Sequence, residues 1–158
     1  MRGFGRWVAF GSVVGLAVCG GVTGAQAVPA VPHGEPFEFS APAGEYCYFA
    51  LQVVGKNAAL VRPGSPGGDV IATGPVAITV TNLETGKARS YNISGPTFVD
   101  AQTGRLTLTG NALVGQPASI SPGDTFLIVT RGRWVFTPQN TIYSINGTIG
   151  HDICAELG

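Results

Sequence analysis

Charged side chains are scarce in this chain. Asp, Glu, Lys and Arg make up 11 % of its 158 residues, against roughly 25 % in a typical soluble domain. Acidic and basic residues balance at nine each, and no basic segment predicts binding to nucleic acid or to anionic lipid. The polar surface must therefore come mainly from Thr, Ser, Asn and Gln, as in many exported β proteins.

Residue types and motifs that carry chemistry are also few. The chain has two histidines, three cysteines and one methionine. We find no phosphate-binding loop, nucleophile elbow or H-E-x-x-H motif, and no D-x-D-x-D calcium spacing. The sequence therefore predicts no cofactor and no metal, and favours a non-catalytic protein. A hydrolase that combines His151, Asp152 and a serine stays open, because a triad is defined by geometry and not by spacing.

The amino terminus has the features of an export signal. Arg2 and Arg6 form a short positive region, and residues 7–18 are uncharged and largely apolar. We expect this run to be the helical core of a signal peptide. An uncleaved membrane anchor is the alternative, because the uncharged run is long enough to span a bilayer.

A cleavage site follows the apolar run. Ala25 and Ala27 provide the two small side chains of an A-x-A motif, which predicts a signal peptide over residues 1–27 and a mature chain that begins at Val28. Cys19 ends a bacterial lipobox-like LAVC, but a valine precedes it where a small residue is usual, so lipidation is the less favoured alternative. Removing 27 of 158 residues leaves 131, enough for one domain with its own core. We expect a secreted protein without stable membrane insertion.

Cys47 and Cys154 are the cysteines that remain after cleavage. An even cysteine count in an oxidising compartment predicts a disulfide. Metal ligands at suitable spacing are missing near Cys47. A free thiol, or a catalytic thiol paired with His33 or His151, remains an alternative.

The mature chain is predicted to begin with a proline-rich lead-in over residues 28–44, followed by a single β domain over residues 45–158. Four prolines keep the lead-in extended, and its EPFEFS stretch is consistent with a short edge strand. Residues 46–54 alternate between apolar and polar positions, with Cys47 on the apolar face.

Strands and turns continue along the domain. VAITVTNL and ARSYNIS flank the turn ETGK at 84–87, which predicts a hairpin. TFLIVT at 125–130 is apolar on both faces, as a central strand is, and RG at 131–132 is predicted to turn the chain back. The alternation slips within residues 140–154, which predicts a bulge near Gly147 or Gly150.

Many short strands with Gly and Pro turns, and no helical periodicity, predict an all-β fold. We expect an antiparallel immunoglobulin-like or Greek-key sandwich of roughly seven to ten strands. A small closed β-barrel is the alternative.

Two surfaces are candidate binding sites. If Arg131, Arg133 and Trp134 meet at a hairpin tip, they could bind a sugar, a carboxylate or a partner protein; otherwise Trp134 belongs to the core. Tyr46 and Tyr48 share the predicted outer face of their strand, where they form a ligand platform or are covered by the lead-in.

The layout resembles uncharacterised small secreted β-rich proteins of actinobacteria. The resemblance is carried by the signal peptide, Cys47 at the first core strand, VTNLETGK at 80–87 and DIC at 152–154. It implies export and a β fold, and it implies no activity. We therefore expect a non-catalytic binding or structural module of the cell envelope or extracellular space, whose partner is an extracellular protein, a glycan or a small molecule. A carrier of a small apolar ligand is the other alternative.

Overall fold

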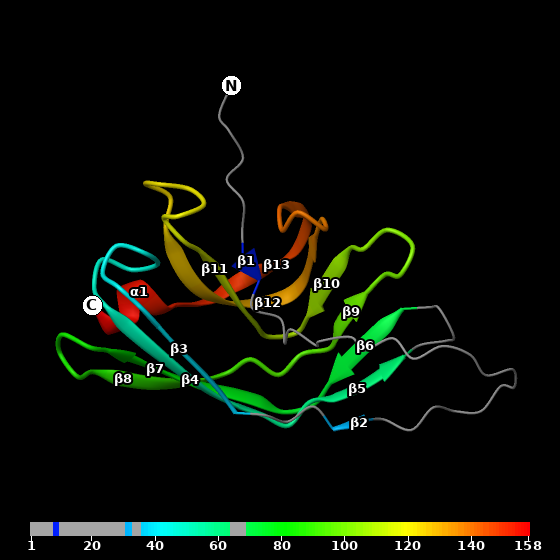
Figure 1. The fold of residues 1–158 in the computed structure, drawn as a ribbon, viewed down its shortest axis with the longest axis horizontal. Helices are drawn as coiled ribbons and strands as arrows, with labels where there is room; N and C mark the ends of the chain where they lie inside the picture. The colour runs from blue at the N-terminus through cyan, green and yellow to red at the C-terminus, as the bar shows by residue number, and fades with distance from the viewer. Residues whose placement is uncertain (1–7, 10–30, 33–35, 64–68) are drawn as a thin grey trace, which may run out of the picture.

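A computed structural model describes residues 8–9, 31–32, 36–63 and 69–158. Antiparallel strands form two sheets, and the chain ends in one short helix (Figure 1). The elements are β1 (Val8–Ala9), β2 (Val31–Pro32), β3 (Phe37–Ala41), β4 (Leu51–Asn57), β5 (Leu60–Pro63), β6 (Val70–Thr73), β7 (Val76–Asn82), β8 (Ala88–Asn92), β9 (Thr97–Val99), β10 (Leu106–Thr109), β11 (Ala112–Gln116), β12 (Phe126–Phe136), β13 (Ile142–Asp152) and α1 (Ile153–Leu157).

The smaller sheet has the strand order β3-β4-β7-β8. The larger sheet runs β1-β11-β12-β10-β9-β6-β5-β2, and β13 also pairs with β12. Among the described residues neither sheet closes on itself. The predicted all-β antiparallel sandwich is confirmed, and the described residues form thirteen strands where seven to ten were expected.

The main core lies between the two sheets. The smaller sheet contributes the alternate residues Val53, Ile78 and Val80, and the larger sheet contributes Leu127 and Val129. Each of these side chains is buried because it faces the opposite sheet, while the residues between them point the other way. The alternation in the sequence therefore identified the inner faces correctly.

A second apolar cluster lies on the opposite face of the larger sheet. Its buried members are Leu108, Ala112, Val114, Ile128, Trp134 and Phe136. Leu127 and Val129 of β12 face the main core, while Ile128 between them faces this second cluster. TFLIVT is apolar on both faces for this reason. In Figure 1 the long strand β12 is strongly curved, and β1 lies inside the curve in this view.

The predicted turn at residues 131–132 is wrong. β12 runs through these residues without interruption, and β13 stays paired with it from end to end. Gly132 has a φ of 98° and donates a backbone hydrogen bond to the carbonyl of Gly110 at 3.0 Å. A Cβ atom at Gly132 would lie 2.6 Å from the Cα of Gly147 on β13. Glycine therefore bends the strand here and does not reverse it.

The lead-in supplies an edge strand. β3 pairs antiparallel with β4, with Phe37 opposite Gly55 and Ala41 opposite Leu51, which confirms the strand expected from EPFEFS. The strand predicted over residues 46–54 begins only at Leu51, because turns and bends occupy the residues before it. The predicted hairpin at ETGK is confirmed as β7–β8, with Gly86 at a φ of 73°.

The predicted bulge is confirmed at Gly150. Val129 pairs with His151 and Thr130 pairs with Ile149, so the glycine between them has no partner on β12. The extra residue changes the phase of β13 in the way that the slipped alternation requires.

The predicted signal peptide, its cleavage site at Ala25, Ala27 and Val28, and Cys19 lie outside the described residues, apart from Val8–Ala9. These two residues form a strand, where a helix was expected. Within the described part of the chain, no helix has the length and apolar character needed to cross a bilayer.

Candidate functional site

The disulfide between Cys47 and Cys154 is confirmed, with Cα atoms 5.2 Å apart. Cys47 is 2 % exposed and belongs to the main core. The bridge joins the turn before β4 to the carboxyl-terminal helix across a sequence separation of 107 residues. Neither cysteine is a free thiol, so a thiol nucleophile or thiolate metal ligand is excluded at these positions.

Cys154 lies in helix α1, which sequence reasoning missed. Asp152 caps the helix by accepting a hydrogen bond from the backbone N–H of Ala155 at 3.0 Å. Ile153 and Leu157 are four residues apart and both buried. An N-cap residue followed by apolar residues at that spacing is the signal that could have identified the helix. A helix this short depends on its tertiary contacts to form.

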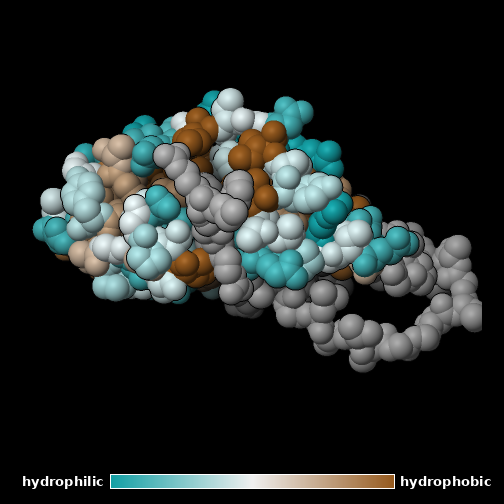
Figure 2. Space-filling model, turned by 90° about the horizontal axis from the view of Figure 1, so that it is seen from above, coloured by the Kyte–Doolittle hydropathy of each residue, from teal (hydrophilic) through white to brown (hydrophobic). Residues whose placement is uncertain are grey.

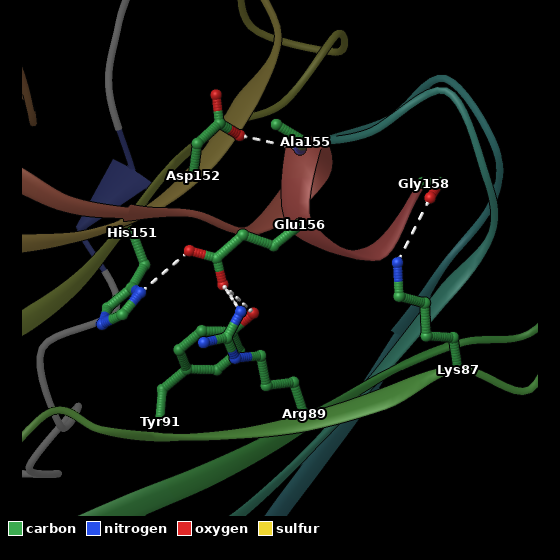
Figure 3. A network of polar contacts seen from close by, with 8 residues as sticks. All are labelled: Lys87, Arg89, Tyr91, His151, Asp152, Ala155, Glu156 and Gly158. Atoms are coloured by element: carbon green, nitrogen blue, oxygen red, sulfur yellow. Dashed lines mark hydrogen bonds and ion pairs between the residues drawn. The ribbon is translucent and has the colours of Figure 1, made fainter.

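A polar cluster fixes α1 to the smaller sheet. We call it the Glu156 cluster; its members are Arg89, Tyr91, His151 and Glu156 (Figure 3). The Oε1 atom of Glu156 lies 2.9 Å from Nδ1 of His151. Its Oε2 atom lies 2.8 Å from a guanidinium nitrogen of Arg89 and accepts a hydrogen bond from the Tyr91 hydroxyl at 3.0 Å. One carboxylate therefore joins β8, β13 and α1.

These contacts change two acidities in opposite directions. Burial acts to raise the pKa of Glu156, but the hydrogen bonds from His151 and Tyr91 and the charge of Arg89 outweigh it, so this pKa lies below its usual value. Burial and the hydrogen bond to the Glu156 carboxylate raise the pKa of the Tyr91 hydroxyl far above its usual value. Both shifts favour the charge states that hold the cluster together.

The Glu156 cluster does not form a hydrolase triad. His151 has a hydrogen bond to Glu156 and a ring contact with Tyr91 at 5.4 Å. Asp152, the acid considered in the sequence, caps α1 and does not orient the imidazole. Within the described residues, no serine or threonine forms a hydrogen bond with His151. The arrangement orients the histidine but supplies no nucleophile for it.

Further contacts hold the end of the chain. Asn82 donates a hydrogen bond from Nδ2 to the carbonyl of Leu157 at 3.0 Å, in a buried position. Lys87 donates from Nζ to the carbonyl of Gly158 at 3.4 Å. Together with the disulfide, these contacts give the region a structural role as the anchor of the carboxyl terminus.

Arg131 and Arg133 do not meet Trp134 at a hairpin tip. Both arginines are exposed on one face of β12, whereas Trp134 is 5 % exposed and packs in the second apolar cluster on the other face. Alternate residues of a strand point to opposite faces, which separates the arginines from the indole. Trp134 is therefore a core residue.

The two arginines share their face with polar residues of β13. Arg131 pairs with Thr148 and Arg133 pairs with Asn146, and directly opposite residues of an antiparallel pair lie on the same face. We call this exposed surface the arginine face; its members are Arg131, Arg133, Ser144, Asn146 and Thr148. Within the described residues, neither arginine forms an ion pair with an acidic group.

The predicted platform of Tyr46 and Tyr48 is also wrong. Tyr46 is 8 % exposed, and its ring lies 6.3 Å from that of Phe39 on β3, whereas Tyr48 is 70 % exposed. The two residues lie in turns and bends before β4, where strand alternation does not apply. The alternative expectation was that the lead-in covers both tyrosines, and this holds for Tyr46 alone.

Sequence reasoning missed the exposed residues of β13. Tyr143, Ile145 and Ile149 are large apolar side chains that are about half exposed. The guanidinium of Arg105 lies 3.8 Å from the centre of the Tyr143 ring. Only the strand order could show that, among the described strands, β13 pairs on one side alone. In the view of Figure 2, brown hydrophobic side chains reach the surface as separate groups among teal ones.

Cavities in the described structure are small or open. A partly open cavity lined by Ala59, Ala72 and Leu108, among others, has a volume of about 30 Å³, which is room for one water molecule. A wider groove of about 370 Å³, lined by Pro36, Lys56 and Asn92, among others, opens to solvent. Across the described ranges, no three His, Cys, Asp or Glu side chains are grouped to hold a metal ion.

Comparisons of the chain with protein-family models, with curated proteins and with solved structures found no significant match.

Proposed function

We propose that this chain is exported and acts outside the cytoplasm as a non-catalytic binding module. The disulfide supports the proposal because structural disulfides form and persist in oxidising compartments. The expected signal peptide, with cleavage before Val28, gives the route. A resemblance to small secreted actinobacterial proteins is consistent with the same location, at the cell envelope or in the extracellular space.

The arginine face is the observation that carries the binding role. Arg131 and Arg133 are two residues apart on β12, both exposed and without acidic partners in the described structure. Hydroxyl and amide groups of Ser144, Asn146 and Thr148 lie beside them. Guanidinium groups bind carboxylates and sulfates through paired hydrogen bonds, and the neighbouring groups suit sugar hydroxyls. An anionic glycan is the ligand class that this surface fits best.

The other two functions have weaker support. A hydrolase needs a nucleophile next to an oriented base, and the recorded partners of His151 are Glu156 and Tyr91. A carrier of a drug-sized apolar molecule needs a cavity of roughly 300–1,000 Å³. The smaller cavity holds about 30 Å³, and the groove of about 370 Å³ is open to solvent and does not enclose a ligand.

Export is tested by the mass of the protein recovered from culture medium. A chain that begins at Val28 and carries the disulfide is expected. A chain retained in the cell with Met1, or one with a lipid on Cys19, would contradict soluble secretion.

Glycan binding is tested with heparin and a polyuronate as anionic probes and neutral dextran as control. The double variant R131A/R133A is expected to lose about tenfold in affinity for both anionic probes. The matched variant K56A/K87A removes the same charge elsewhere and is expected to keep its affinity. Equal losses in both variants would mean a non-specific charge effect and would refute the site.

A further inference from the structure

Strand β1 occupies the outer edge of β11. The two strands pair antiparallel, with Val8 opposite Gly115 and Ala9 opposite Val114. β12 pairs with the other edge of β11. The backbone groups on the outer edge of β11 therefore find a partner in residues that belong to the expected signal peptide.

Cleavage before Val28 removes that partner. β11 then becomes an edge strand, although all five of its residues are buried in the full chain. An edge strand presents unpaired N–H and C=O groups that readily accept another strand. After cleavage these backbone groups are open to water, and a strand added to β11 would pair them and cover its apolar residues again.

The second apolar cluster contains unpaired polar atoms as well. Oε1 of Gln116, on β11, and Nε1 of Trp134, on β12, are buried atoms without a hydrogen-bond partner within the described structure. Gln116 is opposite Phe126, which packs against the same cluster as Trp134. Nε1 of Trp134 lies beside Gly147 on β13, where an added Cβ atom would be 2.9 Å from it, so only the Gln116 acceptor is on β11.

We propose that the outer edge of β11 and the second apolar cluster of the exported chain form a docking site. Its occupant is an extended apolar segment of a partner polypeptide. The inference rests on the proposed export, because cleavage of the leader opens the site. The occupant adds an antiparallel strand to β11, and its apolar side chains pack on Val114 and Ile128 of the second apolar cluster. The leader occupies the same edge before cleavage.

An extended peptide is the occupant that the structure favours. The chain's own β1 already sits on this edge as an antiparallel strand, which shows that the edge accepts a main chain in that direction. Val114 and Ile128 give the site an apolar floor, which suits apolar side chains on alternate positions of the added strand. An aliphatic small molecule would leave the backbone edge unpaired.

The experiment uses the secreted chain purified from culture medium and a peptide copy of residues 5–12, GRWVAFGS, with the tryptophan replaced by phenylalanine. The chain has two tryptophans, Trp7 and Trp134, so only Trp134 fluoresces after cleavage. Titration with the peptide is expected to shift the Trp134 emission with a saturable curve. The matched control is the same peptide with N-methyl groups on the valine and alanine nitrogens, which is expected to bind at least about tenfold more weakly.

The outcomes separate the two proposals. A secreted chain of the cleaved mass that fails to bind the peptide, or binds both peptides equally, overturns the docking site and leaves export intact. A secreted chain that keeps residues 1–27 contradicts the cleavage and overturns the docking site too, and its mass identifies that cause. A full-length chain with a blocked cleavage site is expected not to bind, because its own β1 holds the edge. Strong binding by that chain would also overturn the proposal.

Discussion

Removal of the disulfide should destabilise the chain expected after cleavage before Val28 by several kcal/mol. The perturbation is the double variant C47A/C154A, which leaves no unpaired thiol. The bridge spans a sequence separation of 107 residues. For a closed loop of that length, the chain-entropy relation gives a loss of about 5 kcal/mol at 25 °C. A domain of this size has a total stability of roughly 5–15 kcal/mol, so the variant should be marginally folded.

The structure indicates that most of this loss arises in the unfolded chain. Without the bridge, α1 is still held by the buried hydrogen bond from Asn82 to Leu157 and by the contacts of Glu156 with Arg89 and Tyr91. The native fold should therefore persist, while the unfolded chain gains freedom. Urea unfolding followed by circular dichroism is expected to show a lower midpoint and a larger m-value, because the uncrosslinked chain exposes more surface.

The control is the unmodified chain with a reducing agent, which should lose about the same free energy as the variant. A loss below about 1 kcal/mol with an unchanged m-value would refute the reasoning, because the entropic estimate for this loop is several times larger. A reduced chain that is much more stable than the variant would assign the loss to packing at Cys47.

Three further predictions follow from single residues. G132A should destabilise the chain by roughly 2–5 kcal/mol, because it adds strain at positive φ and a clash with β13. The control G123A also has positive φ but nothing within 4 Å, so it should cost about 1–2 kcal/mol. Equal losses in urea unfolding would contradict the close approach at Gly132. Glu156 has a lowered pKa, so its contribution to the free energy of unfolding is present above pH 4.5, its usual pKa, and is lost as the pH falls below that value. E156Q should therefore flatten the fall in thermal stability between pH 5 and pH 3. An unchanged slope would argue against the Glu156 cluster. Tyr91 has a raised pKa, so its contribution to the free energy of unfolding is present below pH 10.0, its usual pKa, and is lost as the pH rises above that value. Y91F should therefore reduce the loss of stability at alkaline pH. A steeper loss in Y91F would contradict the raised pKa.

Local pattern was a reliable guide where one face of a strand meets the core. Ile78 and Val80 of β7 and Tyr91 of β8 are buried, as their alternation predicts. The slip near Gly150 was visible because a bulge moves side chains to the other face. A short stretch of sequence is enough to show such alternation, because each strand has one buried face and one exposed face.

Pattern failed where the meaning of a residue depends on distant strands. Arg131 and Gly132 read locally as a turn, but β10, β11 and β13 extend the pairing of β12 on both sides of them. Tyr46 and Tyr48 look equivalent in the sequence, yet the ring of Phe39 covers only the first. The capping role of Asp152 is local, but α1 is too short to form without the core beneath Ile153 and Leu157.

The sequence by itself determined the all-β class and the positions of most turns, and it favoured the pairing of Cys47 with Cys154, because alternation, glycine conformation and a cysteine count are properties of the chain alone. The tertiary structure decided which polar groups meet at Glu156, which face carries the arginines and which strand edge β1 covers. These depend on strand order and on the curvature of β12. Long-range backbone pairing fixes both, and a sequence read position by position does not contain it.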